Sequence, residues 1–206
     1  MNVERDDHFV RRLESFSDIV IGFSLAEIVL GLAIPAHAVT LVTHPAWFIY
    51  YLFTFALVAL FWWTHYRLYR TIFFPDTLNV VLNYAWLATV GLLVYFMQVW
   101  SHAHTPNDAI VVSRLYYLTL SANFGVSAIL VARSYRVRSS ALERIGRWRT
   151  LGALWGSLGA CVLLIAALLL TMNVGPNAIW LVSLAIPAGF AAGRLISRPF
   201  IERYVE

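Results

Sequence analysis

Residues 11–34 read RRLESFSDIVIGFSLAEIVLGLAI. The stretch opens with charged residues, passes through Phe16-Ser17-Asp18, and continues as an apolar run with one carboxylate, Glu27, near its middle. An apolar run of this length predicts a helix that crosses a membrane. An ionisable side chain at that depth is costly and by default marks a functional site. We therefore expect the function of the protein to depend on this helix.

The composition indicates a membrane protein. The chain has 206 residues, of which 60% are hydrophobic and 13% charged, and its mean hydropathy is +0.71. In soluble domains about 25% of residues are charged. The composition therefore predicts an all-α polytopic membrane protein, and we expect residues 1–206 to form a single transmembrane domain.

Six segments are long enough to cross the hydrocarbon core, which takes roughly 20 helical residues. They are approximately residues 16–36, 46–66, 77–100, 110–133, 150–172 and 177–197. All 15 basic residues are arginine, and every one except Arg114 lies before the first span, in an even-numbered connection, or at the adjoining ends of the fourth and sixth spans and beyond. By the positive-inside rule, both termini are predicted to be cytoplasmic, in a multi-pass protein of the cell (inner or plasma) membrane.

Several classes of function are not indicated by the sequence. No nucleotide-binding loop, zinc motif or nucleophile–base spacing is present, so we expect neither an enzyme nor a bound cofactor. The net charge of +4 is interpreted as topological, so no nucleic-acid partner is expected. His102, His104 and Asp108 could hold a metal outside the membrane, but solvated loop residues are the favoured interpretation.

Small residues recur at close-packing spacing in the last two predicted spans. They are Gly152, Gly156 and Gly159 in the fifth span, and Gly189 and Gly193 in the sixth. Such residues let helices approach closely. Packing within one subunit is the favoured interpretation, and a contact between subunits is the alternative.

Two other patterns concern helix starts. Pro75 and Asp76 are typical of the start of a helix, where proline is tolerated and an acid complements the dipole. Ser140-x-x-Glu143 fits a capping box and predicts a short basic helix, ending near Arg149, that lies at the inner membrane surface.

A polar cluster is predicted at the cytoplasmic end of the first two spans. Asp18 lies about one turn inside the first span, and Trp62 and His65 lie near the end of the second. An indole N–H and an imidazole at this depth could bond Asp18 and hold the two helices together. Structural packing is the favoured role, and catalysis or proton relay is the alternative.

These residues carry a resemblance to a known family. The pattern R-x-x-x-F-S-D stands at Arg12, Phe16, Ser17 and Asp18, and W-x-x-H at Trp62 and His65. Residues 76–87, with Asn83 inside them, follow as a third block. Together they resemble the transmembrane protein 175 family of potassium channels, and the six predicted spans match one repeat of that family.

The resemblance implies a pore lined by the first helix of each subunit in a homotetramer, without a pore-loop filter. The R-F-S-D and W-x-x-H residues, and Asn83, would pack that helix against its neighbours. Registering the helix on the motif places one set of residues on the pore-facing side, at spacings of 4, 3 and 4. The predicted pore-lining set is Phe23, Glu27, Leu30 and Ile34. Potassium or another monovalent cation would pass down its gradient without a cofactor.

Glu27 departs from the family pattern, in which this position is usually a large aliphatic residue. Four carboxylates around one axis cannot all remain ionised, and a ring of acids favours cations over anions. We hypothesise a conductance that falls on acidification as Glu27 takes up protons.

The alternative for Glu27 is that it faces a neighbouring helix and bonds Ser24, Thr89, Gln98 or Asn123. Two other functions stay open. One is a proton-coupled transporter or proton-conducting protein that uses Glu27, and the other is a non-conducting membrane scaffold.

Overall fold

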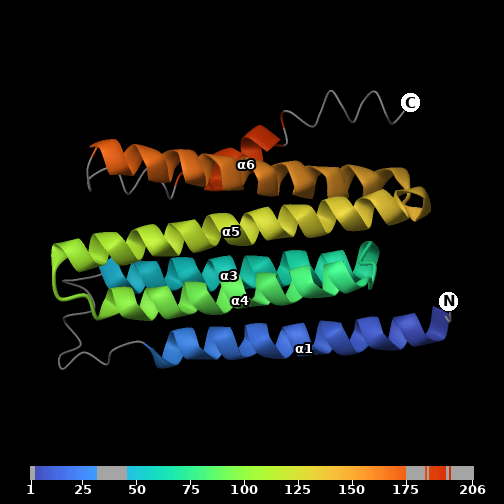
Figure 1. Ribbon diagram of the computed structural model, residues 1–206, viewed down its shortest axis with the longest axis horizontal. Coiled ribbons are helices and arrows are strands. Elements are labelled where there is room, and N and C mark those ends of the chain that lie inside the picture. The colour runs from blue at the N-terminus through green and yellow to red at the C-terminus, as the bar shows by residue number, and fades with distance from the viewer. Residues whose placement is uncertain (1–2, 32–45, 175–183, 185, 194, 196–206) are drawn as a thin grey trace. The chain divides into compact units, whose positions relative to one another are not determined.

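Every described element of the structure, a computed structural model, is a helix, in agreement with the predicted fold class. The structure describes residues 3–31, 46–174, 184, 186–193 and 195. Its elements are α1 (Val3–Leu30), α3 (Ala46–Thr71), α4 (Thr77–Ser101), α5 (Pro106–Arg138), the 3-10 helix η1 (Ser139–Ala141) and α6 (Arg144–Val174), as Figure 1 shows. Residues 186–193 are also helical.

The helices extend beyond most of the predicted spans. α1 begins at Val3 rather than near residue 16, and α3 continues to Thr71. α5 runs through Arg138 and α6 starts at Arg144. The apolar windows end where charged residues begin, but arginine and glutamate are good helix formers, so the backbone stays helical. Of the predicted sixth span, 177–197, the structure describes only residues 184, 186–193 and 195. Ile34, predicted to line the pore, lies outside the described residues.

Three helices of the described part are long and apolar enough to cross a membrane: Thr77–Ser101, Pro106–Ala141 and Ile145–Leu170. The full set of six spans and the orientation of the termini stay predictions. The residues cluster into two compact units, each built from two chain segments. Unit 1 comprises Met1–Arg67 and Val90–Tyr116, and unit 2 comprises Leu68–Thr89 and Tyr117–Glu206.

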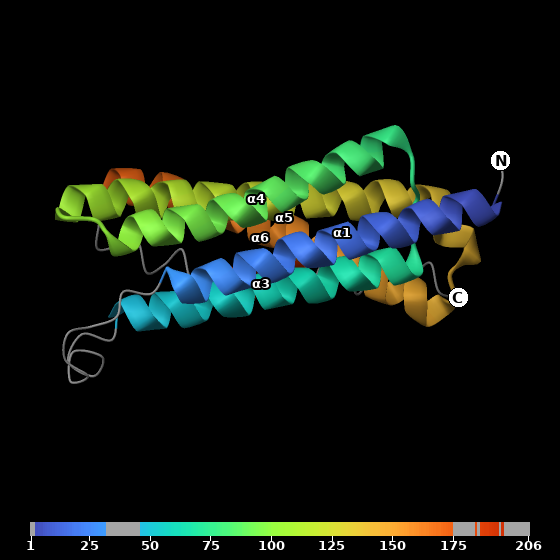
Figure 2. The same ribbon diagram turned by 90° about the horizontal axis from the view of Figure 1, so that it is seen from below.

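In unit 1, α1 packs against α3 and the second half of α4. Figure 2 shows α1 lying along α3. The buried side chains of α1 recur every three or four residues and so form one stripe along the helix. They are Leu13, Ser17, Ile21, Ser24 and Ile28. Ser17 and Ser24 donate to the carbonyl oxygens of Leu13 and Val20, four residues earlier on the helix, at 2.9 and 3.0 Å, so this stripe buries no unpaired hydroxyl.

In unit 2, α6 packs against both α5 and residues 186–193, and Phe124 of α5 also contacts Phe190. The Ser121 hydroxyl of α5 donates to the carbonyl oxygen of Cys161 at 3.2 Å. The glycines where α6 meets residues 186–193 make much closer contacts. A Cβ atom added to Gly159 would overlap the backbone of Gly189, and one added to Gly193 would overlap the backbone of Trp155.

The glycine spacing therefore serves packing within the chain. Gly156 completes the contact, since a Cβ atom there would overlap the ring of Phe190. Gly152 differs, because nothing lies within 4 Å of the position of its added Cβ. The favoured interpretation is confirmed for four of the five glycines, and Gly152 takes no part in this contact.

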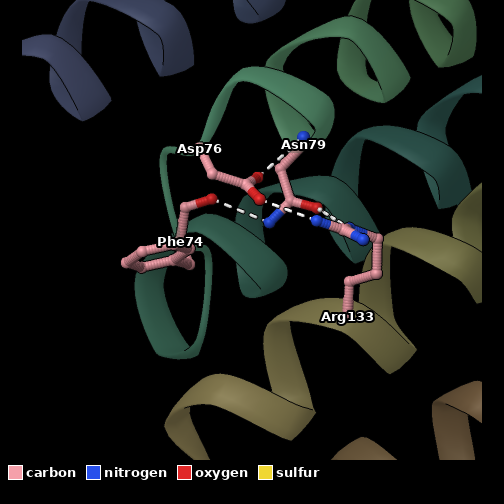
Figure 3. A network of polar contacts seen from close by, with 4 residues as sticks. All are labelled: Phe74, Asp76, Asn79 and Arg133. Atoms are coloured by element: carbon pink, nitrogen blue, oxygen red, sulfur yellow. Dashed lines mark hydrogen bonds and ion pairs between the residues drawn. The ribbon is translucent and has the colours of Figure 1, made fainter.

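The turn between α3 and α4 is tied to α5 by the polar network in Figure 3. Asp76 caps α4, because its Oδ1 accepts the backbone N–H of Asn79 at 2.8 Å. The other carboxylate oxygen accepts from Arg133 of α5 at 2.7 Å. The Asn79 side chain donates to the carbonyl oxygen of Phe74 at 2.8 Å and accepts from Arg133 Nε at 3.1 Å. The predicted helix start at Asp76 is confirmed.

The predicted capping box at Ser140 is wrong. Ser140 belongs to η1, and α6 begins at Arg144, directly after Glu143. Glu143 therefore stands at the N-cap position and not three residues inside a helix. The short surface helix is wrong as well, because residues 144–149 form the first turns of α6 and continue into its apolar part without a break.

Candidate functional site

The predicted pore-lining residues of α1 lie on a face that the chain leaves uncovered. Phe23 is 70% exposed and Leu30 is 84% exposed. Glu27, between them, is also exposed. Ile21 and Ile28, on the buried stripe, are 1% and 0% exposed. The two sets alternate along the helix at spacings of three and four residues, so they occupy different sides of it.

Glu27 lies in an open groove between α1 and the end of α4. The groove has a volume of about 410 Å³ and is lined by Phe23, Ala26, Glu27, Leu30, Gly31, Gln98 and His102. Its walls are mostly apolar, and its polar side chains are the carboxylate of Glu27, the amide of Gln98 and the imidazole of His102. Glu27 therefore faces an open space that holds one acid and one imidazole.

The alternative partners proposed for the Glu27 carboxylate are occupied elsewhere. Gln98 donates to the backbone carbonyl oxygen of Glu27 at 3.3 Å. Ser24 donates to Val20, and Asn123 donates to Thr89 Oγ1 at 2.7 Å. Among the described residues, no side chain donates a hydrogen bond to the Glu27 carboxylate. The interpretation of Glu27 as a helix-packing residue thus finds no bond to support it.

Gln98 fixes the end of α1. The carbonyl oxygen of Glu27 accepts from Gly31 N at 2.9 Å as well as from Gln98. The last carbonyl groups of a helix lack partners within it, so the Gln98 amide helps to satisfy this end. Gly31 allows the approach, because an added Cβ would stand 2.9 Å from the Gln98 side chain. A carboxamide inside an otherwise apolar helix was the sequence signal for this contact.

The polar cluster predicted at the cytoplasmic end of the first span lies near the middle of α1 and contains one of the predicted bonds. Trp62 Nε1 donates to Asp18 Oδ1 at 2.9 Å and joins α3 to α1. Ser17, His65 and Asn83 are buried. Arg12 and Phe16 are exposed, so these two motif residues lie on the surface of the single subunit.

The outer residues considered for a metal lie along a second groove. His102, His104 and Asp108 line it, and its volume is about 580 Å³. In the described part of the chain, no three histidine, cysteine or acidic residues are grouped closely enough to hold a metal ion. Asp108 instead accepts from the Thr105 hydroxyl at 2.7 Å, at the start of α5.

The sequence and the helix arrangement are similar to those of known proteins. Residues 12–93 match the family model described as the endosomal/lysosomal potassium channel TMEM175. The resemblance to this family is confirmed. The matched part contains most of α1, all of α3 and most of α4, and it includes both motifs and the exposed positions Phe23, Glu27 and Leu30. No curated protein sequence matches the chain at a significant level.

Two crystal structures of TMEM175 channels share the fold. One is a variant of the potassium channel MtTMEM175 in complex with a nanobody–MBP fusion protein, with a TM-score of 0.67 and 21% identity over 91% of this chain and 93% of that chain. The other is a lysosomal potassium-selective channel TMEM175 homolog from Chamaesiphon minutus, with a TM-score of 0.68 and 17% identity over 93% of this chain and 99% of that chain. The family is one of ion channels, with a helical fold of the membrane type.

Proposed function

We propose that the protein is a subunit of a cation channel in which the exposed face of α1 lines the ion path. Four subunits would surround one axis in the cell membrane and pass potassium or another monovalent cation down its gradient. Phe23, Glu27, Leu30 and Ile34 would line the pore. The buried or bonded residues Ser17, Asp18, Trp62, His65 and Asn83, together with Arg12 and Phe16, would keep α1 in place.

One observation carries the proposal: α1 leaves a face uncovered that contains a carboxylate. A fully apolar face could rest against lipid, but an ionisable side chain facing hydrocarbon is costly, by up to about 2.5–3.5 kcal/mol at the centre of a membrane-spanning helix and by less toward its ends. The carboxylate therefore needs water, an ion or another subunit beside it. A water-filled pore supplies the first two, and a ring of acids there would attract cations.

Ion flux through reconstituted protein tests the proposal. Purified protein in liposomes is given a potassium gradient and then a sodium gradient, and cation flux is recorded from pH 8 to pH 5. We expect flux of at least one of these ions that falls on acidification, and a smaller fall in Glu27→Gln. His102 lines the same groove, so His102→Gln is the matched control and should keep the pH response of the wild type.

The rival functions give different results in the same assay. A proton-coupled transporter using Glu27 would show proton movement tied to a substrate and a flux that saturates at low turnover. A scaffold would show no flux under any gradient. Identical pH responses in the wild type and Glu27→Gln would refute the hypothesis that protonation of Glu27 lowers the flux.

A further inference from the structure

The strongest charge imbalance in the described residues lies where α5 passes into α6. We call residues 136–149 the α5–α6 corner. With Arg133 just before it, this part of the chain contains six arginines and a single acid, Glu143. Arg133 is paired with Asp76. The arginines of the corner itself therefore retain a large excess of positive charge.

Three of these arginines have no partner among the described residues. Arg136, Arg138 and Arg149 are exposed, and none of them makes a hydrogen bond or an ion pair within the described part of the chain. Arg147 is held differently, since its Nε donates to the carbonyl oxygen of Leu142 at 3.0 Å. That bond leaves the rest of its guanidinium available for an anion.

Exposed apolar side chains stand beside these charges. Ile145 and Trp148 are 63% and 46% exposed, and they share one face of the first turns of α6 with Arg149 at spacings of three and four residues. Tryptophan is enriched at the boundary between lipid and water, where its ring meets hydrocarbon and its N–H meets polar groups. The surface is thus both basic and apolar, whereas a surface for soluble anions needs only charge.

The place of the α5–α6 corner beside two candidate membrane spans indicates what kind of partner it binds. The corner contains the adjoining ends of two helices that are long and apolar enough to cross a membrane, Pro106–Ala141 and Ile145–Leu170, and the short connection between them. A short connection between such helices comes out at the membrane surface. The arginine distribution predicts that this surface is the cytoplasmic one, where anionic lipids attract clusters of basic residues next to a membrane span.

We propose that the α5–α6 corner binds the headgroup of an anionic phospholipid. Arg136, Arg138, Arg147 and Arg149 contact the phosphate, and Ile145 and Trp148 enter the adjoining acyl region. Each arginine near an anionic surface contributes about a fivefold gain in affinity. This inference is separate from ion conduction and holds whether or not the protein is a channel.

Lipid binding to the whole purified protein tests the proposal. The protein in a neutral detergent is titrated with phosphatidylglycerol and, separately, with phosphatidylcholine, and bound lipid is counted by native mass spectrometry. We expect phosphatidylglycerol to bind at least tenfold more tightly. In the double variant Arg136→Gln/Arg149→Gln, the affinity for phosphatidylglycerol should fall by about 25-fold.

A variant at another basic connection is the matched control. Arg67→Gln/Arg70→Gln removes the same charge from the end of α3, where both arginines already have interaction partners, and should weaken phosphatidylglycerol by less than about threefold. Arg136→Lys/Arg149→Lys keeps the charge and should retain binding, which separates lost charge from lost folding.

Two results would overturn the proposal. Equal affinities for the two lipids would remove the anionic headgroup as the partner. Equal losses in the two glutamine variants would mean that total charge matters and the corner does not. Either result would favour an acidic protein as the partner of the exposed arginines instead of a lipid.

Discussion

α1 and α6 each leave one face uncovered, and the two faces differ in a single respect. On α6 the exposed side chains Leu158, Val162, Ile165 and Leu169 follow one another at spacings of 4, 3 and 4. On α1 the exposed positions Ile19, Phe23, Glu27 and Leu30 follow spacings of 4, 4 and 3. The α6 face is entirely apolar and suits lipid, whereas the α1 face holds a carboxylate. Under the proposed function, similar helical geometry serves two surroundings, and one side chain distinguishes them.

Placing a carboxylate on the α6 face and removing the one on the α1 face should produce the largest difference in stability. Val162→Glu places a carboxylate on the α6 face and should destabilise the inserted protein by about 3 kcal/mol, because lipid cannot solvate it. Glu27→Leu makes the reverse change on α1 and should not destabilise the protein. Thermal unfolding in bilayer nanodiscs measures both. Equal destabilisation by the two variants would contradict the distinction between the faces.

Substitutions on the buried and the exposed side of α1 should differ in their effect on stability. Ile28→Ala empties a fully buried position and should cost about 3 kcal/mol in the free energy of unfolding. Leu30→Ala changes a side chain that is 84% exposed and should alter stability by no more than about 0.5 kcal/mol. Denaturation in mixed micelles gives the two values. A loss at Leu30 as large as that at Ile28 would show that this face is covered.

The close contact between α6 and residues 186–193 depends on glycines in both segments. In Gly189→Ala the new methyl group would overlap the backbone of Ala160, so the helices must separate, at an expected cost of about 2 kcal/mol. Gly152→Ala is the control, since its new methyl group meets no atom within 4 Å, and it should be neutral or stabilising. The shift in melting temperature between the two variants tests the close contact. If the two melt at the same temperature, the contact does not constrain α6.

The smallest effect is expected at the bond that joins α1 to α3. Trp62→Phe removes the indole donor to Asp18 and should cost about 1 kcal/mol or less, because the bond is exposed. Trp63→Phe removes a neighbouring indole with no described hydrogen bond and is the matched control. The difference in melting temperature between the two variants measures the bond, and equal values would mean that it does not hold α1.

The sequence alone was sufficient where a signal lay within one helix. The spacing from Phe23 to Leu30 follows from a single helix, and the structure leaves Phe23, Glu27 and Leu30 exposed. The depth of Glu27 in a membrane stays a prediction. The bond between Asp18 and Trp62 was expected because both residues stand at the same predicted depth in adjacent spans.

Signals that join distant parts of the chain were missed. Arg133 lies 57 residues from Asp76, and no periodicity links them. Gln98 was considered as a partner of the Glu27 carboxylate but binds the backbone carbonyl instead, since the carbonyl groups at the end of α1 need donors. The capping box failed because Ser140 and Glu143 have the right spacing, but η1 occupies the place where the helix was expected to begin.

The accessibility of single cysteines along α1 to a charged reagent is the direct test of a pore lined by its exposed face. Cys161 is the single cysteine of the chain, so Cys161→Ser gives a background in which one cysteine at a time can be placed at positions 23, 28 or 30. A positively charged methanethiosulfonate reagent is added while cation flux is recorded. A pore lined by the exposed face of α1 predicts rapid loss of flux for Phe23→Cys and Leu30→Cys and none for Ile28→Cys. Unchanged flux in the first two, or equal block at all three positions, would contradict a pore lined by this face.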